Sequence, residues 1–195
     1  MDYYESVVVH YLRADRALFV NTECCIQLNQ SKNPDSSGPH WYCDAVACDF
    51  RKSRIFLCEI SYGAQLSDLT KRLKEWYANW DSLRHALARD SFVPKDWPVR
   101  PWLFVPVTRV PLLVNRWAAI SGSDKAPKFV PLVTTLEMVQ PWCDWPSWNR
   151  INEQPKPDVV PEEMRTKMSG NGGYPILPVT VRCSPRRAGR VTTAA

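Results

Sequence analysis

The sequence has no long hydrophobic run and no strong excess of one charge. None of its apolar segments approaches the roughly 18–20 residues that a membrane-spanning helix needs, so no membrane partner is expected. The 25 Lys and Arg residues exceed the 20 Asp and Glu residues by only five, which argues against the strong basic stripe of a dedicated nucleic-acid-binding protein. These absences leave a soluble globular domain as the expected class.

Several motifs are absent as well. The seven glycines form no glycine-rich phosphate-binding loop, and no nucleophile elbow is present. Seven cysteines, an odd number in a chain of 195 residues, argue against a closed disulfide framework. The N-terminal segment carries acids early and arginines later, without the basic region and cleavage site of a secretory signal. A cytoplasmic location is therefore expected.

What the sequence does contain is a succession of helical and extended patterns. Residues 3–20 have apolar positions at helical spacing, and residues 23–29 form a short strand candidate. Two more strands are expected on either side of the polar segment RKSR, residues 51–54. A helix, a strand, a second helix and a last strand follow, over residues 66–90, 102–107, 110–121 and 128–139.

This order predicts an α/β fold, αβββαβαβ, in which helices sandwich a central mixed sheet in three layers. The domain is expected to span residues 1–148. From residue 149 to residue 195 the sequence is rich in Pro, Gly and charge without periodicity, which predicts a mostly disordered tail. Tryptophans at 142, 145 and 148 are expected to pack as a cover over the domain rather than to stack on bases.

Two adjacent strands each carry a carboxylate beside apolar residues, although burying an unpaired acid is costly. They are Asp44 and Glu59. A two-residue turn at residues 52–53 predicts that Val46 faces Glu59 and that Asp44 faces Ser61. Both acids then lie on one face of the sheet as diagonal neighbours, about 7–8 Å apart at the backbone. Two carboxylates with water suit a hard divalent cation such as Mg²⁺.

The order of elements, with DAVACD on the second strand and CEIS on the third, resembles the PD-(D/E)XK nuclease superfamily. The resemblance covers about residues 3–140 and implies a restriction-endonuclease-like fold that hydrolyses DNA phosphodiester bonds. In that family the two strand acids bind Mg²⁺ or Mn²⁺, which implies Asp44 and Glu59 as the metal ligands. An acid from the first helix often completes the site, and here the resemblance implies Glu5.

The sequence departs from the family at the lysine that follows the strand-three acid by two residues. Ser61 stands there, and a hydroxyl supplies no positive charge. Some members carry this lysine on the following helix, where this chain offers Lys71, Arg72 and Lys74. With Leu73 at the centre of the apolar face, Arg72 and Lys74 lie at its two flanks and Lys71 points to solvent. Lys74 is therefore the predicted catalytic cation.

Other interpretations stay open. The missing lysine and the weak charge also fit a catalytically inactive protein of the same fold that binds nucleic acid or regulates a larger system. The expected partner is nucleic acid, DNA in the first place, and a homodimer or larger complex is a further expectation. Asp44 and Glu59 can also be solvated acids at strand ends, and Glu5 an ordinary exposed helix residue.

The segment HWYCDAVAC raises a zinc interpretation. Zinc sites take four ligands, often from paired Cys-x-x-Cys motifs, which the chain lacks. The strand alternation also predicts that Cys43 and Cys48 point to opposite faces of the sheet. Packing in the core is the favoured role of these cysteines.

Deletion of residues 151–195 should leave the thermal midpoint of the domain almost unchanged, because a segment without a packed core contributes little to stability. Differential scanning calorimetry of the full and shortened chains checks this. A drop of many degrees would mean that the tail docks on the domain.

Overall fold

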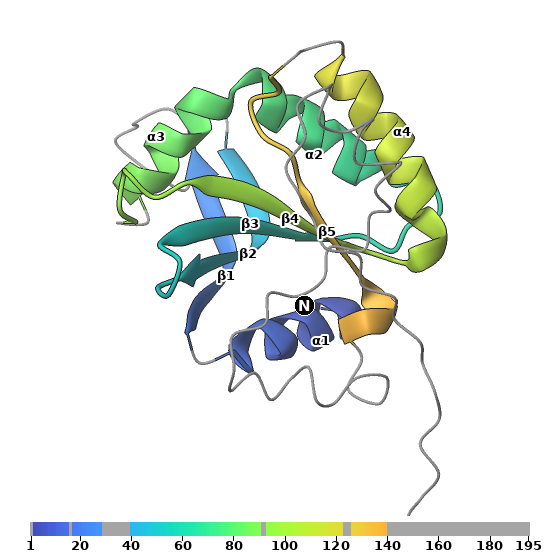
Figure 1. Cartoon of the computed structure of the whole chain (residues 1–195), viewed down its shortest axis with the longest axis horizontal. Helices are drawn as coiled ribbons and strands as arrows, with labels where there is room; N and C mark the ends of the chain where they lie inside the picture. Colours follow the sequence, from blue (N-terminus) through green and yellow to red (C-terminus); the bar gives the residue numbers. More distant parts are fainter. Residues whose placement is uncertain (1, 16, 29–39, 91–92, 123–125, 140–195) are drawn as a thin grey trace, which may run out of the picture.

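The computed structural model describes residues 2–15, 17–28, 40–90, 93–122 and 126–139, which form a mixed α/β fold with four helices and one five-stranded sheet. The strands lie side by side in the order of the sequence (Figure 1). The elements are α1 (Tyr3–Arg13), β1 (Leu18–Gln27), β2 (His40–Asp49), β3 (Arg54–Ile60), α2 (Ser67–Ala78), α3 (Trp80–Asp90), β4 (Val99–Val105), η1 (Val107–Arg109), α4 (Val110–Ser121), β5 (Leu132–Thr135) and η2 (Leu136–Val139).

The sheet is half antiparallel and half parallel. Strand β2 pairs antiparallel with β1 and with β3, whereas β4 pairs parallel with β3 and with β5. A parallel pair needs a crossover connection, and helices supply it here: α2 and α3 join β3 to β4, and α4 joins β4 to β5. The expected order of elements is confirmed at this level.

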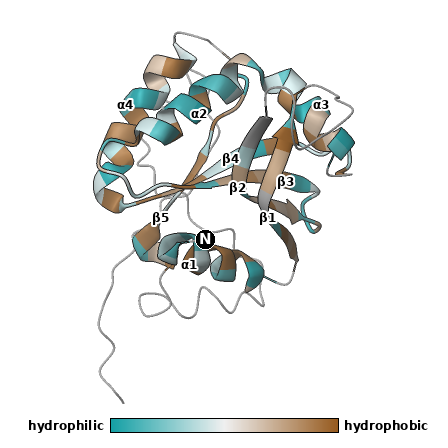
Figure 2. Ribbon diagram, turned by 180° about the vertical axis from the view of Figure 1, so that it is seen from behind, coloured by the Kyte–Doolittle hydropathy of each residue, from teal (hydrophilic) through white to brown (hydrophobic). Residues whose placement is uncertain are grey.

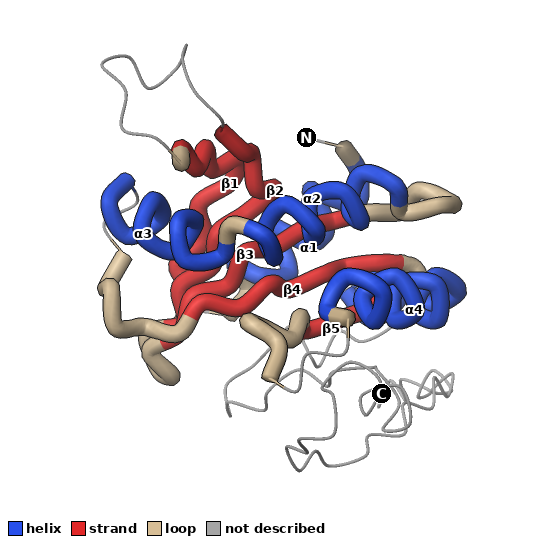
Figure 3. Tube along the Cα trace, turned by 90° about the horizontal axis from the view of Figure 1, so that it is seen from above, coloured by secondary structure: helices blue, strands red, loops and turns tan. Residues whose placement is uncertain are grey.

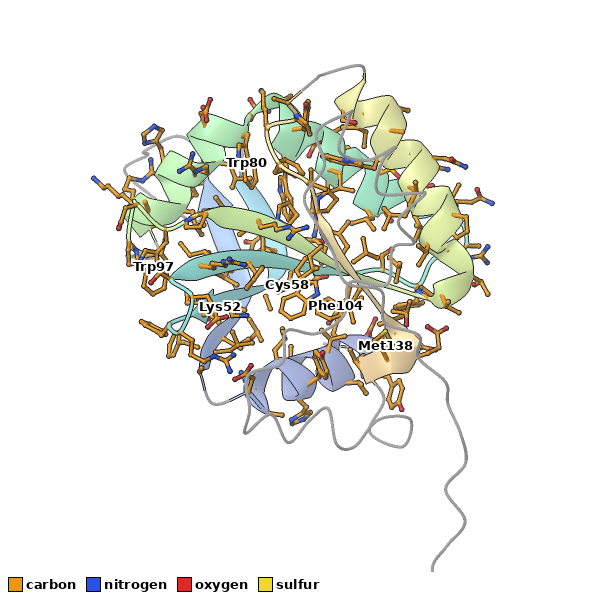
Figure 4. The ribbon with its side chains drawn as sticks, in the orientation of Figure 1. Lys52, Cys58, Trp80, Trp97, Phe104 and Met138 are labelled. Atoms are coloured by element: carbon orange, nitrogen blue, oxygen red, sulfur yellow. The ribbon has the colours of Figure 1, made fainter. Side chains whose placement is uncertain are left out.

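The sheet lies between two layers of helices. Helices α2, α3 and α4 lie over one face (Figures 1 and 3), and α1 lies across the other, next to η2. The first layer buries Leu73, Leu83, Trp76, Trp80 and Trp117 against the strands. In the second layer, Cys58 and Phe104 face α1 (Figure 4) and pack in one cluster with Tyr11 and Leu12. Hydrophobic and hydrophilic residues both occur on each of these helices (Figure 2), as amphipathic helices over a sheet require.

Helix α1 is shorter than predicted. Its start is fixed by a capping box, in which the Asp2 carboxylate accepts a hydrogen bond from Glu5 N and the Glu5 carboxylate accepts one from Asp2 N. The helix ends at Arg13, and the second half of the predicted helix belongs to a turn and to β1. The turn is held by Asp15, whose carboxylate accepts a hydrogen bond from Ala17 N at 3.1 Å.

The helix predicted over residues 66–90 is divided in two at Asn79. The Asn79 side chain donates a hydrogen bond to the carbonyl of Glu75 at 3.0 Å, so it competes for the backbone of the preceding turn. The apolar face itself is confirmed, because the positions that form it are buried on α2 and α3: Leu69, Leu73, Trp76, Trp80, Leu83 and Leu87. The predicted last strand is also shorter, since β5 gives way to the 3₁₀ helix η2.

The predicted register of the β2–β3 hairpin is wrong. Asp49 pairs with Arg54, so the connection holds four residues instead of two, and Val46 pairs with Leu57 rather than with Glu59. Ser53 closes this turn with φ of 49°, in the left-handed region. Because the shift is an even number of residues, the division of the paired residues 45–49 and 54–58 into faces is unchanged, and Val46 and Leu57 lie in one cluster under α2–α4.

The expectation for the cysteines is also wrong in one respect. Cys43 and Cys48 pack in the same hydrophobic cluster, on the face covered by α2–α4, and not on opposite faces. The Cys43 thiol is fully buried and donates to the carbonyl oxygens of Ala45 and Cys58, at 3.1 and 3.2 Å. These contacts satisfy the thiol within the core.

No described helix is long and apolar enough to cross a membrane. The predicted tail, residues 149–195, and the three tryptophans at 142, 145 and 148 lie outside the described residues.

Arg51→Ala should lower the free energy of unfolding by about 3 kcal/mol, because it removes a cation that pairs with two buried carboxylates. Arg51 lies 2.5 Å from Asp15 and 3.4 Å from Asp49, and the Asp15 side chain is only 1% exposed. Urea unfolding measures the change, with the exposed neighbour Lys52→Ala as the control. Equal effects of the two substitutions would contradict this account.

Candidate functional site

The two predicted acids meet where the β2–β3 ladder ends. The last pair of the ladder is Ala45 with Cys58, and the next residue on each strand is an acid, Asp44 on β2 and Glu59 on β3. The Asp44 carboxylate crosses to β3, where Oδ2 accepts a hydrogen bond from the Ile60 backbone N–H at 2.7 Å. A side chain thus takes the place of a backbone carbonyl, and this holds Asp44 beside the segment that carries Glu59.

Glu59 is buried, with 4% of its surface exposed. It lies on a strand that has neighbours on both sides, and it pairs with Leu103 of β4. Its Oε2 accepts a short hydrogen bond of 2.5 Å from Arg72 Nη1. Its Oε1 is also buried and has no N–H or O–H donor among the described residues, although the Cys43 thiol, a weak donor, also acts on this carboxylate. One oxygen of this carboxylate is therefore satisfied, and the other is available.

Arg72 is the cation of the site. Its Nη1 lies 2.5 Å from Glu59 Oε2 and 3.9 Å from Asp44 Oδ1. It projects from α2 beside Leu73, which is buried in the core. Two carboxylates and one guanidinium leave a formal charge of −1 when all three are ionised, which favours a further cation.

Burial and nearby negative charges raise the pKa of both carboxyls. Desolvation, followed by the negative charge of Asp44, raises the pKa of Glu59 to about 8, even though Arg72 acts in the opposite direction. Desolvation also raises the pKa of Asp44, against the hydrogen bond from Ile60 and the charge of Arg72. A cation bound between the two acids would reverse these shifts, because it favours the ionised forms.

Helix α1 brings two more acids near this pair. The charges of Glu5 and Asp2 contribute to the raised pKa of Asp44, which means that the start of α1 lies within electrostatic reach of the site. Glu5 is engaged in the capping box, where its Oε2 accepts a hydrogen bond from Asp2 N at 3.0 Å. In the described part of the chain no group of three or more His, Cys, Asp and Glu side chains is placed to hold a metal, so Glu5 does not join Asp44 and Glu59 as a third ligand.

The predicted lysine is not the residue that reaches the acids. Lys74 is exposed on α2, whereas Arg72 makes both ion pairs. The two side chains flank Leu73 symmetrically, so the apolar periodicity alone could not distinguish them. Ser61, at the family's lysine position, continues the parallel ladder by donating its backbone N–H to Phe104 O at 2.9 Å.

Comparison with known proteins gives no relative: no family model, no curated protein and no solved structure matches the chain. The function is therefore argued from the geometry of the site. The side chains that carry the argument are Asp44, Glu59 and Arg72.

Glu59→Gln should become more stable relative to the wild type as pH rises from about 5 to 8. In this window the folded wild type holds a proton on Glu59 (pKa about 8) that the unfolded chain (pKa 4.5) releases, so its free energy of unfolding falls with pH. Glutamine keeps the shape of the protonated acid without titrating.

Urea midpoints at pH 5, 6.5 and 8 measure this difference, whose slope can reach about 1.4 kcal/mol per pH unit. Glu75→Gln, at a partly exposed position on α2, is the matched control and should show no such slope. A flat difference for Glu59→Gln would mean that Glu59 is ionised in the folded chain throughout.

Proposed function

We propose that this chain is a metal-dependent nuclease of the restriction-endonuclease-like fold, which hydrolyses phosphodiester bonds of DNA at Asp44, Glu59 and Arg72. One observation carries the proposal: the buried Oε1 of Glu59 has no N–H or O–H donor among the described residues, although it belongs to a carboxylate beside a second acid. A buried carboxylate oxygen without a donor is unfavourable. A divalent cation bound by the pair would remove that penalty.

The arrangement of the sheet supports the same proposal. An antiparallel run of three strands follows the first helix, and the acids lie on its second and third strands. A helical crossover then leads to a strand parallel to the third. These features agree with the expected αβββαβαβ order of restriction-endonuclease-like domains.

The donor set fits Mg²⁺ or Mn²⁺. Asp44 Oδ1 and Glu59 Oε1 are the oxygens of the pair that are not occupied by the hydrogen bonds of Ile60 and Arg72. Mg²⁺ keeps several of its waters and is commonly held by one or two carboxylates together with phosphate oxygens, so two protein ligands suffice. When bound, the ion would polarise the phosphate and lower the pKa of a water molecule.

Arg72 has the role that Ser61 cannot fill. Its guanidinium has five N–H donors, of which the hydrogen bond to Glu59 uses one, so it can also contact a phosphate oxygen. In hydrolysis a water oxygen bonds to phosphorus, the ester P–O bond breaks, and the leaving oxygen takes up a proton. Negative charge develops on the phosphoryl oxygens meanwhile, and a fixed cation within reach of both acids offsets it.

A second candidate is a nuclease-fold protein without catalysis, which binds nucleic acid or a regulatory partner. The ion pair of 2.5 Å between Arg72 and Glu59 favours it, because the guanidinium already supplies a cation to the acid. The two candidates differ in the effect that removal of Arg72 should have on cleavage.

Isothermal titration with Mn²⁺ should show binding to the wild type that Asp44→Asn weakens at least about tenfold, since it replaces one of two anionic ligands. Arg72→Ala should bind Mn²⁺ as tightly or more tightly, because it removes a competing cation. Equal binding by the wild type and Asp44→Asn would contradict the metal site.

Cleavage assays on the same variants, with plasmid, linear and single-stranded DNA and with RNA, separate the two candidates. For a nuclease, Asp44→Asn and Glu59→Gln should abolish cleavage, and Arg72→Ala should reduce it about 10²–10³-fold while metal binding persists. Exposed Lys74→Ala is the control and should leave cleavage unchanged. Metal binding without cleavage of any substrate would favour the second candidate.

A further inference from the structure

Three tyrosines form a cluster between the start of α1 and the end of β3. The rings of Tyr4 and Tyr62 lie 4.9 Å apart with 35° between their planes, and those of Tyr3 and Tyr4 lie 5.4 Å apart, edge to face. The outer two members are exposed, Tyr3 by 56% and Tyr62 by 50%. These three residues are called the tyrosine cluster below.

The cluster adjoins the candidate site. Tyr62 follows Glu59 by three residues, just beyond the end of β3. The Asp2 carboxylate lies near enough to raise the pKa of the Tyr62 hydroxyl, and Asp2 is one of the two acids at the start of α1 whose charge reaches Asp44. Helices α1 and α2 cover opposite faces of the sheet, so the cluster and Arg72 approach the acid pair from opposite sides.

The exposed ring of Tyr62 is held on one side. It packs against the ring of Tyr4, while half of the residue's surface stays in solvent. A ring held in this way loses little conformational entropy when a flat partner stacks on it. Phe19, with 66% exposure on β1, is comparably exposed. What distinguishes the tyrosine cluster is its place beside the acid pair.

The charge around the cluster indicates which part of a nucleotide it would contact. Asp2 and Glu5 lie at this end of α1, so a phosphate group would be repelled there. A nucleobase is uncharged, flat and aromatic, and stacking on tyrosine suits every base. The phosphate is then left to Arg72 and to the acid pair with its cation.

We propose that the tyrosine cluster is a stacking surface for an unpaired nucleobase, so that the site acts on single-stranded or frayed nucleic acid. This inference rests on the proposed function. In a duplex both faces of a base are covered by its neighbours, and only an unpaired base offers a face to a protein ring.

Fluorescence anisotropy with the full chain tests the proposal. A labelled single-stranded oligonucleotide of mixed sequence and its duplex are titrated in Ca²⁺, so that affinity is read without cleavage. The single strand should bind more tightly than the duplex, and Tyr62→Ala should weaken its binding about 5- to 150-fold, as loss of one stacked base does. Tyr62→Phe, which keeps the ring, should retain most of the affinity.

Two further variants keep the result decisive. Tyr3→Ala removes an exposed ring at the first position of α1, and it should weaken single-strand binding even if Tyr62→Ala proves unstable. Phe19→Ala removes a ring on β1 that is at least as exposed, and it should leave the affinity unchanged. Equal affinities of Tyr3→Ala and Phe19→Ala, or equal binding of single strand and duplex by the wild type, would overturn the proposal.

Failure of the stacking surface and failure of the nuclease proposal give different results. Tyrosine-dependent binding of single strands without cleavage would support the stacking surface and contradict the nuclease proposal. The opposite result is cleavage of single strand and duplex that depends on Asp44 but is unaffected by Tyr62→Ala and Tyr3→Ala. It would support the nuclease proposal and contradict the stacking surface. A parallel titration with single-stranded RNA shows whether the sugar matters.

Discussion

The hydrogen bond from the Ile60 amide to the Asp44 carboxylate decides where the candidate site forms. Beyond the pair Ala45–Cys58 the two strands exchange no further ladder bonds, and the freed N–H of β3 is satisfied by a side chain instead of a backbone carbonyl. A buried amide without a partner is unfavourable, so this substitution keeps Asp44 inside the fold. The position of the acid thus follows from the backbone's need for an acceptor, and Glu59 lies one residue before the amide that Asp44 satisfies.

The negative charges around this hydrogen bond are only partly compensated. A buried acid, Glu59, and a half-buried one, Asp44, both with raised pKa values, share one guanidinium, and one carboxylate oxygen has no N–H or O–H donor among the described residues. Packing elsewhere must compensate for such an arrangement, which is typical of functional sites. The compensation is visible in the surrounding core, where Leu57, Leu73 and Leu103 are buried beside the strands and helix that carry the three charged residues.

The sequence was sufficient for the order of elements and for the shared face of the acids, because both depend on periodicity. The assignment of both acids to one face holds although the predicted turn length was wrong, because an error of two residues does not change the alternation of side chains. The sequence was insufficient to predict the turn itself, because the polar segment RKSR is compatible with a turn of two or of four residues. Nothing in that segment marks Ser53 as the residue with a left-handed backbone. The choice of Arg72 over Lys74 depends on how α2 is rotated over the sheet, and the placement of Cys43 depends on where the ladder ends. Both are tertiary properties.

The acid pair and its cation all come from residues 44–72, within one antiparallel hairpin and the helix that follows it. Local pairings of this kind form early in folding, whereas a parallel strand such as β4 docks only after a longer loop has closed. In the finished fold β4 covers one side of Glu59, and the pKa of its carboxyl is about 8 against 4.5 in a solvated chain. Folding at neutral pH is therefore coupled to the uptake of a proton from solvent, and the acid pair of the folded protein carries less negative charge than the same two residues in the unfolded chain.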